Sequence, residues 1–131
     1  MSDYQVVNPA TGEVEKEFDT ATDEQIQDVL ARSHAAYLSW RTTDKGERTK
    51  MLLRVADLYD ERRDELAAII AREMGKRIPE AKGEIRLVAS IYRYYAEQGP
   101  ALLADTPLSP KAGGQAVIRK EPIGPMLGIM P

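Results

Sequence analysis

The apolar side chains between residues 22 and 98 recur every three or four residues in three successive segments. This spacing predicts amphipathic helices over residues 22–40, 45–74 and 79–98. Helices with one apolar face must pack that face against other parts of the protein, so the pattern limits the fold more than any other feature. The residues expected on the packed faces are Ile26, Val29, Leu30, Tyr37, Trp40, Met51, Leu52, Val55, Leu58, Tyr59, Leu66, Ile69, Ile70, Met74, Ile85, Val88, Ile91, Tyr92 and Tyr95.

Start and stop signals bound these helices. Thr22 is followed three residues later by Gln25, which is the pattern of a capping box, and Asp44 is suited to cap the second helix. Gly75 is typical of the position just after a helix, and Pro79 favours the first turn of the next one.

Three further features concern the second and third helices. Gly83 costs about 1 kcal/mol relative to alanine inside a helix, which suggests a close packing contact there. Gly99 and Pro100 are expected to end the third helix. The charged run at residues 60–65 is interpreted as a solvated face, with a binding patch as the less favoured alternative.

The remaining segments read as short strands and turns. Residues 4–18 predict a hairpin around Asn8-Pro9 and Thr11-Gly12. Residues 101–115 are rich in proline and glycine and are expected to form loops and turns. Residues 116–120 predict a strand, and residues 124–131 predict another that is apolar on both faces, as in a parallel sheet covered by helices. Taken alone, the chain is expected to be α+β, with three helices, an N-terminal hairpin and the start of a parallel sheet.

Composition excludes several classes of function. The net charge is −3 and no basic stripe is present, so we expect no nucleic-acid partner. No run approaches the roughly 18 apolar residues that a membrane span requires, and the first residues lack the features of a secretory signal. A cytoplasmic location is therefore expected. The sequence has no cysteine, which excludes a disulfide, a zinc–thiolate site and a thiol nucleophile on this chain.

No residue pattern describes a complete active site. His34 is the only histidine, and without clustered carboxylates it is not expected to bind metal or to catalyse. Gly113-Gly114 is interpreted as a turn, because no helix or Lys-Ser/Thr pair follows as in a phosphate-binding loop. No catalytic residue and no metal ligand is therefore assigned.

Four short motifs, in order along the whole chain, resemble the N-terminal part of the NAD(P)-dependent aldehyde dehydrogenases. They are "NPATGE" at residues 8–13, "EMGK" at 73–76, "RYYAE" at 93–97 and "KEPIGPMLGIMP" at 120–131. Each motif is weak alone, and their order and spacing carry the resemblance. The stretch "RYYAEQGPALLAD" is most similar to the succinate-semialdehyde dehydrogenase branch.

The resemblance implies an α/β parent fold with three regions in this chain. Residues 1–104 would form the N-terminal hairpin and the helical part of the cofactor-binding domain. Residues 105–120 would begin an oligomerisation arm, and residues 121–131 would be the first strand of a Rossmann-like cofactor-binding sheet, here truncated. A homo-oligomer is the assembly that the resemblance implies.

The family's reaction uses a cysteine thiolate that attacks the aldehyde, NAD or NADP as hydride acceptor, and a glutamate that activates water. The cysteine and the glutamate would lie beyond residue 131, so the chain alone is expected to be an inactive fragment that does not bind the cofactor. The resemblance places Ile129, Met130 and Pro131 at the nucleotide pocket and Leu87 beside the substrate tunnel. A different hypothesis is a stand-alone helical interaction module, which would associate through its open strand and its apolar helix faces.

Overall fold

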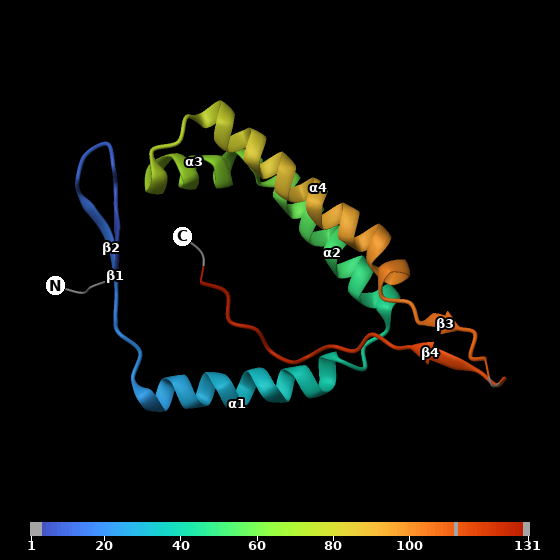
Figure 1. Cartoon of the computed structure of the whole chain (residues 1–131). Coiled ribbons are helices and arrows are strands. Elements are labelled where there is room, and N and C mark those ends of the chain that lie inside the picture. Colours follow the sequence, from blue (N-terminus) through green and yellow to red (C-terminus); the bar gives the residue numbers. More distant parts are fainter. Residues whose placement is uncertain (1–3, 112, 130–131) are drawn as a thin grey trace.

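The computed structural model describes residues 4–111 and 113–129. Figure 1 shows a β-hairpin, a separate helix, a group of packed helices and a second, projecting hairpin. The elements in chain order are β1 (Tyr4–Val7), β2 (Val14–Phe18), α1 (Asp23–Trp40), α2 (Lys45–Glu61), α3 (Arg63–Met74), α4 (Ile78–Leu102), β3 (Thr106–Leu108) and β4 (Ala116–Ile118).

The predicted helix boundaries are largely confirmed. The Thr22 hydroxyl accepts a hydrogen bond from the Gln25 amide while the Gln25 side chain accepts one from the Thr22 amide, so the capping box is complete. An Asp44 carboxylate oxygen accepts the Gly46 amide at 2.8 Å and caps α2. Gly75 follows α3 in the left-handed region with φ 69°, and Pro79 lies in the first turn of α4.

The segment expected to be one helix over residues 45–74 is two helices. Arg62, with φ −101° and ψ 19°, departs from helical geometry and separates α2 from α3. The interpretation of residues 60–65 as a solvated face is correct for most of the run, but Asp60 and Arg63 are only half-exposed and pair with each other across the break. The charged run therefore contains a helix junction that amphipathic periodicity does not reveal.

The expectation that Gly99 and Pro100 end the third helix is wrong, since α4 continues to Leu102. A proline inside a helix leaves the carbonyl four residues earlier without its usual donor, which here is the carbonyl of Ala96. The Thr49 hydroxyl on α2 donates to that carbonyl at 3.1 Å. A side chain from the neighbouring helix therefore replaces the missing backbone hydrogen bond.

The core of the described residues lies between α4 and the pair α2 and α3, and it is lined mainly by small side chains. The buried hydrophobic residues are Ala56, Ala67, Ala81, Ile85, Ala89 and Ala96. Of the large residues expected on the packed faces, Ile85 is buried, whereas Ile91 and Tyr95 are exposed. Alanines let the helix backbones approach closely, while larger side chains such as Tyr59 and Tyr92, whose rings stack between α2 and α4 at 5.6 Å, are only half-buried.

Two expectations about packing are not met. The apolar face of α1 was expected to pack, yet α1 has no buried residue, and Ile26, Val29 and Leu30 are about half-exposed. Gly83 makes no close contact, because the nearest atom to a side chain built there is the Arg86 guanidinium at 4.0 Å. Its place in α4 has no packing explanation in this structure.

Both sheets of the described residues are antiparallel hairpins, so the expected start of a parallel sheet is not observed. The predicted N-terminal hairpin is confirmed as β1 and β2. Part of the expected loop forms β3, in which Pro107 lies opposite Val117 of β4. Residues 119–129 form no strand, since a strand needs a hydrogen-bonded neighbour and the described residues provide none there.

The N-terminal hairpin rests against the end of α3. The Arg72 guanidinium pairs with the Glu15 carboxylate at 2.7 Å, and a side chain at Gly75 would meet the Pro9 ring at 3.1 Å. Gly75 is thus required both by its positive φ and by the close approach of the hairpin.

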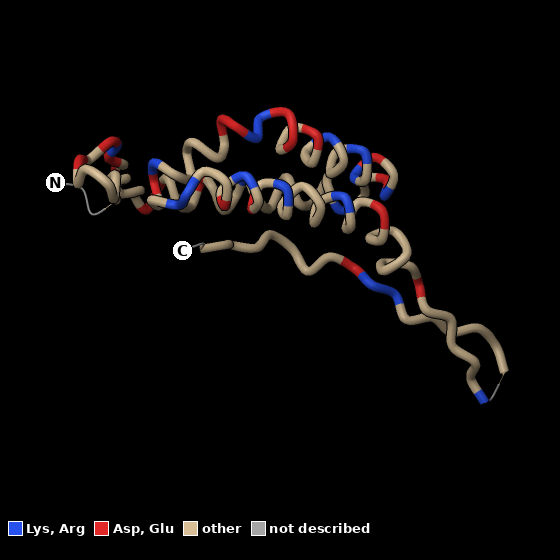
Figure 2. Tube along the Cα trace, turned by 90° about the horizontal axis from the view of Figure 1, so that it is seen from above, with Lys and Arg blue, Asp and Glu red and all other residues tan. Residues whose placement is uncertain are grey.

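Charge is spread along the helices and is absent from the end of the chain. Figure 2 shows Lys and Arg interspersed with Asp and Glu along the helices, whereas the segment after Glu121 carries no charged residue. Within the described part of the chain, no helix is both long and apolar enough to cross a membrane.

Candidate functional site

The sequence-predicted site residues lie on two separate elements. Ile129 is in the irregular segment that ends the described chain, and the residue is 86% exposed. Met130 and Pro131 lie outside the described residues. Leu87 is on α4 and is 59% exposed, half a helical turn away from the buried Ala89 and Ile85. It therefore faces away from α2 and α3 and is free to contact a ligand or another part of the protein.

The start of the apolar C-terminal segment is held in place at four successive residues, 119–122, which we call the anchor segment. Its first two residues bind the end of α4 and the chain that follows α4. The Arg119 guanidinium pairs with the Asp105 carboxylate at 3.0 Å, and the Lys120 ammonium donates to the Leu102 carbonyl at 2.6 Å. The latter bond satisfies a carbonyl at the helix C-terminus, where cations are favoured.

The last two residues of the anchor segment bind α1, which is far away in sequence. The Tyr37 hydroxyl donates to the Pro122 carbonyl at 3.0 Å, and the Arg41 guanidinium lies 3.4 Å from the Glu121 carboxylate. The Arg41 guanidinium also lies over the Tyr37 ring, 5.5 Å from its centroid, as in a cation–π pair. Figure 1 shows the segment passing the C-terminal end of α1 on its way back towards the helices.

Sequence reasoning assigned Tyr37 only to the apolar face of a helix and gave Arg41 no role. Their partners lie 85 and 80 residues away, so no local spacing pattern could have found them. The one available signal was the aromatic–basic pair at four-residue spacing on the last turn of a helix.

A shallow hollow of about 200 Å³ lies between α2 and the end of α4. Its lining residues are Lys45, Arg48, Thr49, Leu52, Tyr95, Gly99, Pro100 and Leu103. The Lys45 ammonium donates to the Leu103 carbonyl at 2.9 Å, so this cation serves the helix end. Neither Leu87 nor Ile129 lines this hollow. Its polar contact joins α2 to the end of α4 and does not indicate a ligand site.

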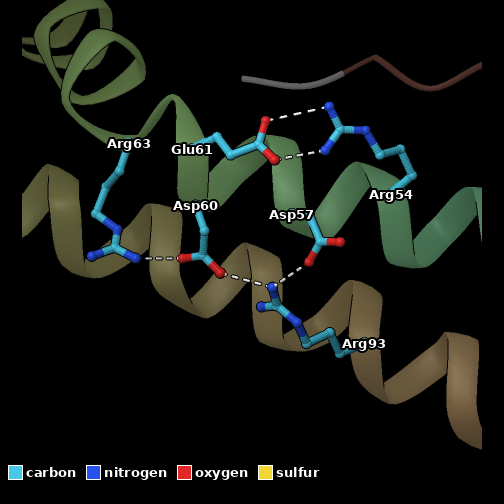
Figure 3. Close-up of polar contacts among 6 residues, drawn as sticks. All are labelled: Arg54, Asp57, Asp60, Glu61, Arg63 and Arg93. Atoms are coloured by element: carbon cyan, nitrogen blue, oxygen red, sulfur yellow. Dashed lines mark hydrogen bonds and ion pairs between the residues drawn. The ribbon is translucent and has the colours of Figure 1, made fainter.

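An ion-pair network joins α2, α3 and α4 at the break near Arg62 (Figure 3). The Arg93 guanidinium contacts Asp57 at 2.9 Å and Asp60 at 2.8 Å, and Asp60 also binds Arg63. The hydrogen bonds from Arg63 and then Arg93 lower the pKa of Asp60 below its ordinary value. A carboxylate held ionised by two guanidinium groups stabilises the helix junction and is a poor general acid.

The other candidates of the sequence do not form a catalytic cluster. The His34 ring lies 6.2 Å from the Tyr37 ring at a tilt of 43°. Among the described residues, no three histidine, cysteine or acidic side chains gather in a way that could hold a metal ion. Gly113 and Gly114 have positive φ angles of 78° and 94°, as expected of a turn.

The end of the described chain offers apolar surface, and the described residues include no phosphate-binding turn. Ile129, Leu127 and Met126 offer exposed apolar surface of the kind that contacts a base or a nicotinamide ring. A glycine-rich turn at a helix N-terminus, which would hold the cofactor's pyrophosphate, is not found in the described ranges.

Comparison with known proteins identifies the family. Residues 1–131 match the family model described as "Aldehyde dehydrogenase family". The chain is 42% identical over 128 residues to "Succinate-semialdehyde dehydrogenase [NADP(+)]" of Deinococcus radiodurans, with 98% of this chain and 27% of that protein covered. It is 40% identical over 127 residues to "Succinate-semialdehyde dehydrogenase [NADP(+)] 1" of Mycobacterium bovis, which covers 95% of this chain and 28% of the relative.

Solved structures with a similar fold carry the same name as these relatives. The succinic semialdehyde dehydrogenase of Streptococcus pyogenes, in complex with NADP+, superposes with a TM-score of 0.81 at 42% identity and covers 87% of this chain and 25% of that one. The succinate-semialdehyde dehydrogenase of Burkholderia pseudomallei superposes with a TM-score of 0.82 at 36% identity and covers 92% of this chain and 25% of that one.

The chain spans about a quarter of the length of these relatives and matches their N-terminal region. The alternative of a stand-alone helical interaction module finds no support in these comparisons. With a family match over its whole length, the four predicted motifs in order and the fold of the solved relatives, the chain belongs to the aldehyde dehydrogenase family.

Proposed function

We propose that this chain is the N-terminal part of an enzyme that oxidises succinate semialdehyde to the carboxylic acid with NADP. The observation that carries this proposal is the 42% identity, over nearly the whole chain, to a relative named for that substrate and cofactor. NADP supplies a hydride acceptor when bound. The nucleophilic cysteine and the general-base glutamate belong to sequence outside these 131 residues, which contain no cysteine.

The residues of this chain would bind and orient rather than react. Residues 121–131 would complete a first strand of the cofactor-binding sheet once neighbouring strands supply hydrogen-bond partners, with Ile129, Met130 and Pro131 lining the nucleotide pocket. The apolar, exposed surface of Ile129 supports this role.

Leu87 would border the path of the aldehyde. Its outward position on α4 supports contact with a substrate, and Ile91 and Tyr94, four and seven residues on, extend the same exposed face. An apolar wall excludes water from a tunnel and leaves recognition of the charged substrate carboxylate to other residues.

The remaining regional assignments follow from the same parentage. Residues 1–104 would form the hairpin and helical part of the cofactor-binding domain, and residues 105–120 would begin an arm that joins subunits of a homo-oligomer. The projection of β3 and β4 away from the helices in Figure 1 supports an arm. We also propose a cytoplasmic location, where NADP is available.

The test compares three proteins by NADPH formation with succinate semialdehyde: the 131-residue chain, the complete protein that carries it, and a chimera. In the chimera, this chain replaces the matching segment of the Deinococcus radiodurans relative. We expect no activity and no NADP binding from the chain alone, and NADP-dependent oxidation by the other two. Complete protein that is folded yet inactive with this aldehyde, or that prefers NAD, would refute the substrate or the cofactor assignment respectively.

Leu87→Ala and Leu87→Trp in the complete protein test the tunnel assignment. A tunnel residue predicts that these changes alter KM for the aldehyde and leave KM for NADP unchanged. Arg86→Ala, at the exposed neighbouring position, is the matched control.

A further inference from the structure

The apolar C-terminal segment depends on the anchor segment for its position. Beyond Pro122 the side chains are strongly exposed, with Ile123 at 97% and Leu127 at 83%. Within the described residues, the side-chain bonds that hold the end of the chain are those of residues 119–122. The anchor segment therefore sets where the following residues begin.

The anchors also fix where the apolar segment begins. Residues 119–129 form no strand, and the backbone departs from extended geometry at Gly124, which has a φ of 130°. Ile129 lies seven residues after Pro122. Four consecutive residues with four different partners hold the start of this segment in one place beside α1 and the end of α4.

Two of the four partners connect the segment to a distant element. Arg119 and Lys120 bind the chain near the end of α4, a short distance earlier in sequence, whereas Glu121 and Pro122 bind α1. Tyr37 and Arg41 are one helical turn apart and contact each other. They act as one unit on the last two anchored residues before the apolar stretch.

We propose that Tyr37 and Arg41 are positioning residues for the cofactor: by holding Pro122 and Glu121 they fix the point from which residues 123–129 reach the nucleotide pocket. This inference rests on the proposed NADP-dependent function. The two side chains do not touch the cofactor themselves, and their effect passes through the backbone of residues 121–129.

The experiment measures Kd for NADP by calorimetry on the complete protein, together with kcat and both KM values. Tyr37→Phe removes one hydroxyl and one hydrogen bond, so we expect NADP Kd and KM to rise about threefold to tenfold. We expect kcat and the aldehyde KM to stay within about twofold, because the reacting groups are untouched. Tyr59→Phe removes a hydroxyl from a ring that stacks on Tyr92 of α4, and it should leave Kd unchanged.

A charge exchange keeps the test decisive if Tyr37→Phe merely loosens the fold. Arg41→Glu places two carboxylates together and should weaken NADP binding, whereas Arg41→Glu with Glu121→Arg should restore it. A positioning role is overturned if Kd stays unchanged in Tyr37→Phe and Arg41→Glu, or if both KM values and kcat deteriorate together without rescue. If the unmodified protein neither binds nor reduces NADP, the proposed function fails, and that outcome is separate from unchanged Kd in an active enzyme.

Discussion

The continuation of α4 beyond Pro100 should depend on the hydroxyl of Thr49. Thr49→Val keeps the shape of the side chain but leaves the carbonyl of Ala96, a residue only 1% exposed, without a donor. A buried polar group left unpaired costs about 1–3 kcal/mol. We therefore expect Thr49→Val to lower the free energy of opening at the end of α4 by about 2 kcal/mol, the middle of that range.

The matching change restores the donor from the other side. Pro100→Ala returns a backbone N–H that can bond the Ala96 carbonyl, so Thr49→Val should cost less than about 1 kcal/mol in that background. Hydrogen exchange of the α4 amides in the complete protein measures these local free energies. Thr42→Val, at an exposed hydroxyl bonded to Ser39, is the control. Equal costs of Thr49→Val with and without Pro100 would refute the reasoning.

Three further outcomes follow from described contacts. Gly75→Ala should destabilise docking of the N-terminal hairpin by about 2–3 kcal/mol, because the new methyl group clashes with Pro9 and the residue keeps its strained left-handed backbone. Gly113→Ala, in the turn between β3 and β4 with open space around it, should cost only about 1 kcal/mol, from the backbone strain alone. Hydrogen exchange of the amides of each hairpin measures the two costs. Asp60→Asn should lower the melting temperature most at neutral pH: the folded pKa is depressed, so the native carboxylate's contribution is present above its ordinary pKa and disappears as the pH falls below about 4. A difference between variant and parent that does not shrink in acid would contradict this assignment. Thr22→Ala should reduce the helicity of α1 at a cost of about 1 kcal/mol, seen as faster exchange of its first-turn amides and not of its last turn.

Local chemistry was predictable from the sequence where it depends on nearby residues. Thr22 with Gln25, Asp44, Gly75 and Pro79 act within one turn of their own position, and each was confirmed. Periodicity likewise located the helices. These features follow from backbone groups that every helix end must satisfy, whatever the rest of the fold.

Features that depend on distant partners were missed. Pro100 reads as a stop because the Thr49 hydroxyl that compensates for it lies about fifty residues earlier. The core follows alanines because α2 and α4 approach closely, while hydrophobicity alone favoured larger residues such as Ile91. The expected strand at residues 124–131 lacked a neighbour among the described residues, so the pattern identified a strand-forming segment without its sheet.

Of the candidate site, the sequence motifs indicated the family. Ile129 and Leu87 stay predicted site residues, and the structure adds that both are exposed. The groups that hold the approach to Ile129 could not be predicted, because Tyr37 and Arg41 carry no motif and their partners are defined only by the folded chain.

The break at Arg62 has a mechanical consequence. One continuous helix, α4, about 37 Å long, packs against both α2 and α3 and so spans the break between them. Arg93 of α4 pairs with Asp57 and Asp60 at the end of α2, and Lys82 of α4 pairs with Asp64 of α3 at 2.8 Å. Because α4 is bound to both helices, α2 and α3 cannot move relative to each other without breaking contacts with α4. The kink is therefore a fixed bend and not a hinge, and the three helices should open and close as one cooperative unit.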